Sequence, residues 1–136
     1  MLRSLAAFFF FALPVSAQDT LSASNVSIDD YLWTHRPVIV FADSPADPRF
    51  IEQMRLLDVG VADLTDRDVV VIVDTDPLAV SDLRQSLRPR GFSLVLIGKD
   101  GRVKLRKPLP WDTRELGRVI DKMPMRQQEL KSRRSD

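Results

Sequence analysis

The chain has 136 residues, enough for one domain with its own hydrophobic core. Its 20 basic and 19 acidic residues nearly cancel, and this balance gives no reason to expect nucleic acid as a partner. The absence of cysteine excludes disulfides, thiol catalysis and thiolate metal sites.

The first 17 residues have the pattern of a secretory signal peptide. Arg3 supplies the positive start, residues 5–13 form an apolar run, and Val15-Ser16-Ala17 is a small-residue cleavage site. The apolar run is too short for a membrane-spanning helix. We therefore expect cleavage after Ala17 and a mature protein in the periplasm or outside the cell, without stable membrane insertion.

Residues 18–28 form a polar lead, and the pattern of a folded domain covers residues 29–130. Ser27 caps a short predicted helix over residues 27–33, with Asp30 completing a capping box. Residues 38–41 are apolar throughout, as in a central strand buried on both faces.

A longer helix is predicted after this strand. Asp47 before Pro48 has the pattern of an N-cap followed by proline in the first helical turn. Apolar side chains then recur at helical spacing, and they are Phe50, Met54, Leu57 and Val61. Gly60 is a candidate early end for this helix, and residues 69–73 form the second buried strand.

The second half of the chain repeats the start signal at Asp76-Pro77. The predicted helix is lined by Val80, Leu83 and Leu87 and ends before Pro89. A third strand over residues 92–97, a tight turn and an alternating strand over residues 103–106 form a hairpin.

The last predicted helix begins at a capping box formed by Asp112 and Glu115. Pro124 must interrupt or restart it, because proline lacks an N–H and crowds the preceding turn. Residues 131–136 are polar and charged, and we expect a disordered tail.

This order of elements predicts an α/β fold with a central mixed four-stranded sheet and helices on both faces. It is the element order of the thioredoxin fold, and residues 90–102 resemble the thioredoxin strand-turn-strand segment. Where thioredoxins carry a cis-proline this chain has Ser93, and where they carry the Cys-x-x-Cys pair it has Pro45 and Pro48. The resemblance therefore implies neither a thiol-disulfide oxidoreductase nor a thiol peroxidase.

A closer resemblance covers residues 29–129 and rests on five groups of residues: Arg36-Pro37 with the following strand, Asp47-Pro48-Arg49 with Gln53, residues 67–70, residues 98–106, and residues 120–126. Taken together, these motifs resemble a family of exported bacterial proteins that is known only as a domain of unknown function. That family is similar to P-DUDES, a peroxiredoxin-like domain of animal extracellular matrix and sushi-repeat proteins. The resemblance implies a thioredoxin-like fold outside the cytoplasm and no established reaction, substrate or catalytic residue.

Four acidic residues follow the first two predicted strands and form what we call the acidic rim: Asp43, Asp47, Asp74 and Asp76. Two interpretations are open. The carboxylates form a hard-cation site or an acid/base pair at the edge of the sheet. Alternatively, they are helix caps and turn residues, which the two Asp-Pro pairs favour.

Five basic residues lie in the predicted hairpin, and we call these five the basic hairpin. They are Lys99, Arg102, Lys104, Arg106 and Lys107. They form a strip for an acidic ligand, or they protect an edge strand from pairing with another sheet. Arg49 and Arg126 are further candidate ligand-binding residues, the latter beside Met125 in a contact surface.

The leading hypothesis is an exported thioredoxin-like domain without redox cysteines that acts as a non-catalytic binding or interaction module. Its partner would be an acidic small molecule or a protein, and we expect no cofactor, no metal and no catalytic residue. The alternative is a carboxylate-based metal-binding protein or enzyme that uses the acidic rim. A purely structural role without a ligand is a third interpretation.

Overall fold

The computed structural model describes residues 20–136, so the predicted signal peptide lies outside the described residues. The domain is built on a five-stranded mixed sheet with the strand order β1-β3-β2-β4-β5. Its strands are β1 (Leu21–Ser22), β2 (Arg36–Phe41), β3 (Val69–Asp74), β4 (Ser93–Ile97) and β5 (Val103–Lys107). β2 runs parallel to β3 and antiparallel to β4, and β5 is an edge strand that pairs with β4 alone.

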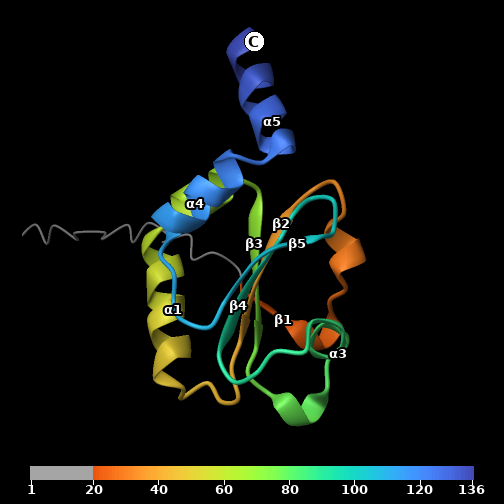
Figure 1. Cartoon of the computed structure of the whole chain (residues 1–136), viewed down its shortest axis with the longest axis vertical. Coiled ribbons are helices and arrows are strands. Elements are labelled where there is room, and N and C mark those ends of the chain that lie inside the picture. The colour runs from red at the N-terminus through yellow and green to blue at the C-terminus, as the bar shows by residue number, and fades with distance from the viewer. Residues whose placement is uncertain (1–19) are drawn as a thin grey trace, which may run out of the picture.

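Helices cover both faces of this sheet (Figure 1). On one face lie α1 (Pro48–Val59), α2 (Val61–Asp66) and α4 (Thr113–Asp121); on the other lie α3 (Asp82–Leu87) and the 3₁₀ turns η1 (Ala23–Asn25) and η2 (Ile28–Tyr31). The last helix, α5 (Pro124–Ser135), extends beyond the end of the sheet (Figure 1). Within residues 20–136, no helix is long and apolar enough to cross a membrane.

The core has two parts because the side chains of β2 alternate between the two faces. Val38 and Val40 pack with Leu57 of α1 and Leu116 of α4. Ile39 and Phe41 instead pack with Leu83 and Leu87 of α3. The continuous apolar run of β2 is therefore explained by burial on both sides, as predicted.

The start and end of α1 follow from local chemistry. The Asp47 side chain accepts a hydrogen bond from the Arg49 N–H at 2.9 Å, which caps the helix. Gly60 separates α1 from α2, where the backbone passes close to α4. A Cβ on Gly60 would lie within 2.5 Å of three Thr113 side-chain atoms, so this close approach requires glycine.

The structure corrects the predicted order in two places. The polar lead contributes β1, whose two residues pair in parallel with β3, so the sheet has five strands and not four. The helix predicted from Pro77 is divided into η3 (Pro77–Ala79) and α3. Val80 between them has a left-handed backbone with φ of 46°, and Ser81 caps α3 through the Arg84 N–H.

The expected disordered tail is also corrected. Pro124 does restart the chain as a helix, but α5 then continues through the charged residues to Ser135. Arg133 forms an ion pair with Asp66 at 2.7 Å, and this long-range contact connects the last turns of α5 to α2. Composition alone does not reveal such a partner.

Candidate functional site

The turn between β2 and α1 contains no sulfur. Pro45 lies in this turn, and Pro48 is the first residue of α1. Arg49 donates to Asp47 from its backbone and its guanidinium, with the Nη2–Oδ2 distance at 3.1 Å, and these bonds lower the pKa of Asp47. The Arg49 guanidinium also lies 5.7 Å from the ring centroid of Phe92. The helix start is thus occupied by an ion pair and two prolines.

The acidic rim is largely engaged by its own domain. Asp74 is 6% exposed and accepts hydrogen bonds from Ser81 Oγ at 2.5 Å and from Arg84 Nη2 at 2.9 Å. Burial raises the pKa of Asp74, but the bonds from Arg84 and Ser81 outweigh burial and lower it. Asp76 accepts from the Leu78 N–H at 3.2 Å and begins η3, whereas Asp43 is exposed.

Within residues 20–136, no three histidine or acidic side chains are grouped in a way that holds a metal ion. The hydrogen bonds of Asp47, Asp74 and Asp76 are instead those of helix caps and turns.

The side chains of the basic hairpin also have internal partners. Lys104 Nζ lies 2.8 Å from Asp100 Oδ2, and Arg106 Nη1 donates to the Leu87 carbonyl at 2.7 Å. The Lys107 ammonium lies 4.4 Å from the ring centroid of Trp111. Because β5 is an edge strand, these side chains also line the open edge of the sheet.

Lys99 differs from the rest of the basic hairpin because it is buried in a group of ion pairs at the amino-terminal end of β2. Its Nζ lies 2.7 Å from Glu129 Oε1 and 2.8 Å from Asp68 Oδ2. Arg36, at the start of β2, is fully buried, and its Nη2 contacts the same Glu129 oxygen at 2.9 Å. Glu129 belongs to α5, so it connects this helix to β2 and to the β4–β5 turn.

We call these four residues, Arg36, Asp68, Lys99 and Glu129, the Glu129 cluster. The carboxylate of Glu129 is only 23% exposed. Burial opposes its ionisation, but the hydrogen bonds from Arg36 and Lys99 outweigh burial and lower its pKa. Glu129 is therefore ionised at neutral pH and compensates the charge of the two buried cations.

Arg126 forms a second connection between α5 and the domain. This side chain is 2% exposed and pairs with Asp66 of α2 at 2.9 Å and with Asp121 of α4 at 3.2 Å. Arg67 pairs with the other oxygen of Asp121 at 2.9 Å, and bonds from Arg67 and Arg126 lower the pKa of Asp121. The first turns of α5 are thus attached by ion pairs to α2, α4, β2 and the hairpin.

A pocket of about 160 Å³ lies beside the Glu129 cluster. We call it the α5 pocket; its lining includes Arg36, Gly98, Lys99, Lys104, Met123 and Met125. Within residues 20–136, Arg36 Nε is the one buried side-chain nitrogen or oxygen without a hydrogen-bond partner. The α5 pocket therefore combines methionine side chains with cations and with an unused buried donor.

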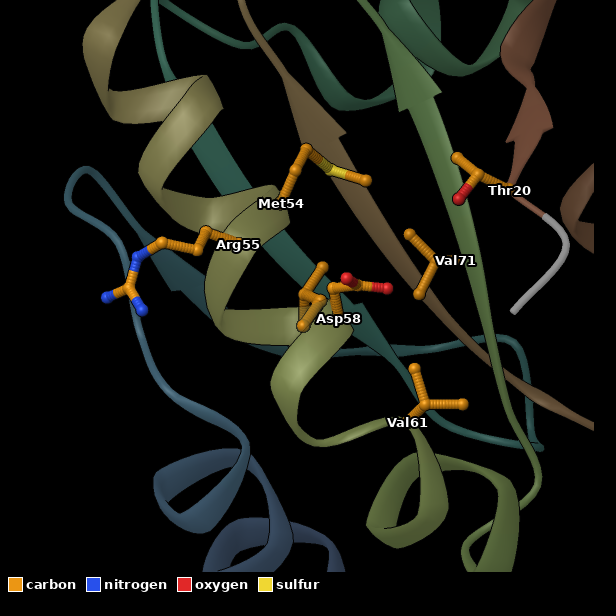
Figure 2. A pocket seen from close by; sticks show the side chains of 7 residues that line it. Thr20, Met54, Arg55, Asp58, Val61 and Val71 are labelled. Atoms are coloured by element: carbon orange, nitrogen blue, oxygen red, sulfur yellow. The ribbon is translucent and has the colours of Figure 1, made fainter. Parts of the chain in front are cut away.

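A second pocket, of about 320 Å³, lies between α1 and β3 (Figure 2). Met54, Val61 and Val71 supply apolar lining. Figure 2 shows Arg55 directed away from Val71, and its guanidinium is paired with Glu52 at 2.6 Å. The polar residues of its lining are Thr20, Arg55 and Asp58, whereas the α5 pocket has three cations and an unused buried donor. The α5 pocket is therefore the better candidate binding site.

Only some residues of this candidate site were predicted from the sequence. Lys99, Lys104 and Arg126 were separate candidates, whereas Arg36 and Glu129 were not among the predicted site residues. Arg36, Lys99 and Arg126 all belong to motifs that carry the family resemblance, and the fold brings these distant motifs to one end of the sheet. Membership of these motifs was the one sequence signal that could have indicated that the three residues belong to a common site.

Comparisons with solved structures define the class of fold. Desulfothioredoxin from Desulfovibrio vulgaris Hildenborough, in its reduced form, has a TM-score of 0.56 at 18% identity, covering 76% of this chain and 96% of that chain. Chloroplastic thioredoxin z has a TM-score of 0.55 at 22% identity, over 74% of this chain and 90% of that one. Reduced 2-Cys peroxiredoxin from Plasmodium vivax has a TM-score of 0.57 at 13% identity, over 76% and 85%. The fold is thioredoxin-like.

The particular family follows from the sequence. The model of the family described as Domain of unknown function (DUF4174) matches residues 27–129, and the chain belongs to this family. No curated protein matches the chain in sequence.

We predict that Glu129→Gln strongly destabilises the domain at neutral pH. The substitution leaves Arg36 and Lys99 buried without their shared counter-charge, and we expect a loss of about 3 kcal/mol in the free energy of unfolding. Denaturant unfolding at pH 7 measures this loss. Glu52→Gln is the matched control: its partner Arg55 has a 60% exposed side chain, so the unfolding midpoint should barely change.

The difference between wild type and Glu129→Gln also depends on pH. A lowered carboxyl pKa stabilises the fold above the ordinary glutamate pKa of about 4.3, and this contribution is lost as pH falls through the lower folded-state value. The two proteins should therefore approach each other in stability in acid. A difference that stays constant from neutral to acidic pH would contradict the assigned role of Glu129.

Proposed function

We propose that this protein is an exported, non-catalytic binding module built on a thioredoxin-like frame. The observation that supports the proposal most directly is the start of α1, where Pro45 precedes the helix and Pro48 is its first residue. The sequence resemblance matches these two positions to the thioredoxin cysteine pair. A dithiol at a helix start is the chemical centre of such a redox site, since the helix dipole stabilises a thiolate there. In this chain the helix start lacks sulfur.

The binding role is supported by the α5 pocket at the opposite end of β2. A concave site with apolar lining and a few convergent polar groups is the usual form of a small-molecule site. Placement outside the cytoplasm is supported by the pattern of residues 1–17 and by the motifs that resemble exported bacterial proteins and P-DUDES.

A paired assay tests the absence of redox catalysis. The protein lacking residues 1–17 should show no turnover in disulfide-reductase and peroxidase assays, because it has no thiolate. Pro45→Cys/Pro48→Cys should form an intramolecular disulfide, since the two positions are three residues apart across the turn into α1. Turnover by the cysteine-free protein in these or in broader hydrolase assays would overturn the proposal.

Partner recovery tests the binding role. The immobilised mature protein should recover specific partners from a cell-envelope extract, and Lys104→Glu/Arg106→Glu should lose those that recognise the basic hairpin. Arg114→Glu/Arg118→Glu is the control, because it makes the same change of charge at exposed positions of α4. Recovery of nothing specific by the wild type would contradict the binding role, and equal recovery by both variants would exclude the basic hairpin as the surface.

Export is tested by expressing the full chain with a C-terminal tag. The protein should accumulate in the periplasm or medium, with a mass that corresponds to loss of residues 1–17. Retention of the full-length mass in the cytoplasm, while a reference exported protein is processed in the same cells, would exclude export.

A further inference from the structure

We infer that the α5 pocket binds a small carboxylate that carries a short apolar group. The inference deepens the proposed binding function, on which it rests, by naming the chemical class of the ligand. It is carried by three independent features of the pocket: an unused buried donor, an uncapped helix start and an apolar wall of limited volume.

The first feature is the guanidinium of Arg36. Its Nη1 and Nη2 atoms donate to Glu129 and to the Arg67 carbonyl, whereas its Nε–H has no acceptor although it is buried. An unmet hydrogen bond at a buried charged group costs free energy. Arg36 lines the α5 pocket, so a ligand oxygen that displaces the atoms covering this N–H would supply the acceptor that the protein itself does not.

The second feature is the amino-terminal end of α5. Pro124 and Met125, the first two residues of this twelve-residue helix, line the pocket. Met123 is the N-cap residue and provides no side-chain hydrogen bond, so the amides of Met125 and Arg126 have no side-chain cap. Uncapped amides at a helix start favour an anion through both hydrogen bonding and the helix dipole.

The charged side chains around the α5 pocket leave one cation free to meet an anion. The lining has three cations, Arg36, Lys99 and Lys104, and one carboxylate, Asp100. Lys99 is fully engaged with Asp68 and Glu129, and Asp100 is held by Lys104 and by the Arg102 N–H at 3.0 Å. Lys104 is the movable group: its side chain is 31% exposed, so it can turn from Asp100 towards a bound anion.

Gly98 allows the side chains of Lys104 and Asp100 to lie close to the backbone beside the pocket. A Cβ on Gly98 would lie 2.5 Å from Lys104 Cε and 2.8 Å from Asp100 Oδ1. Lys104 and Asp100 therefore pack directly over the backbone just after the end of β4, where a larger residue at position 98 would displace them.

The volume and the methionines define the rest of the ligand. A volume of about 160 Å³ corresponds to roughly five water molecules at about 30 Å³ each, so the pocket suits a ligand with about that number of non-hydrogen atoms. Met123 and Met125 present adaptable apolar surface beside these donors. A carboxylate with two to four carbon atoms in total fits both the volume and the lining, and the same group occurs at the C-terminus of a peptide.

The test is a titration of the ¹⁵N-labelled mature protein with butyrate at constant ionic strength, followed by NMR. We expect saturable shifts at the amides of Met125 and Arg126 and at the Arg36 Nε–H, with half-saturation in the millimolar range for so small a ligand. Butyramide should have no such effect because it lacks the charge, and inorganic phosphate should bind more weakly because it lacks the apolar group.

Two variants locate the binding site. Lys104→Gln should weaken butyrate binding by about threefold or more, and Lys107→Gln, on the same strand but outside the pocket lining, should leave it unchanged. N-acetyl-glycyl-valine and its C-terminal amide distinguish the two sources of a carboxylate. Tighter binding of N-acetyl-glycyl-valine than of butyrate would identify the ligand as the C-terminus of a peptide. Tighter binding of butyrate would identify it as a small carboxylic acid.

The inference is overturned if butyrate and the peptide acid both leave the three reporter signals unshifted, if butyramide shifts them equally, or if phosphate binds as well as butyrate. These outcomes are distinct from failure of the proposed function. Specific partner recovery without carboxylate binding would leave the binding module in place with another ligand. Catalytic turnover would overturn the binding-only role whether or not butyrate binds.

Discussion

The structure depends on one carboxylate that serves two buried cations. Glu129 lies within 2.9 Å of both Arg36 and Lys99, and neither cation has appreciable access to water. A buried ion pair adds little net stability compared with an apolar contact, but loss of one partner leaves a charge that the interior does not solvate. The Glu129 cluster therefore determines where α5 must lie: Arg36 gains its carboxylate partner, and Lys99 its second one, only when this helix is docked.

The two ends of the central strand β2 therefore differ in how their polar groups are used. At the carboxyl ends of β2 and β3, where α/β folds commonly bind ligands, the polar groups form caps and internal ion pairs, as Asp74 does with Arg84. At the opposite end, the docking of α5 leaves a small pocket whose donors are not all used. The frame is thus that of a thioredoxin-like protein, while the buried donor that lacks an acceptor lies at the opposite end of the central strand.

Much of this fold was predictable because its signals are local. The apolar runs of β2, β3 and β4, the caps at Asp47 and Asp112 and the break at Gly60 all depend on neighbouring residues, and all appear in the structure. The candidate site was less predictable because its members come from β2, the β4–β5 turn and α5. Nothing near Arg36 in the sequence indicates that its partner is Glu129, and a long-range ion pair leaves no periodic pattern. The disordered tail was wrongly predicted for the same reason, because the ion pair between Arg133 and Asp66 joins residues far apart in the sequence.

The position of Glu129 on α5 has a consequence for the cooperativity of the fold. Arg36 of β2 has its ion-pair partner on α5, whereas Lys99 also pairs with Asp68, which precedes β3. The charge of Arg36 is compensated by a carboxylate only once α5 has docked, so the sheet and this helix are expected to form and open as one cooperative unit.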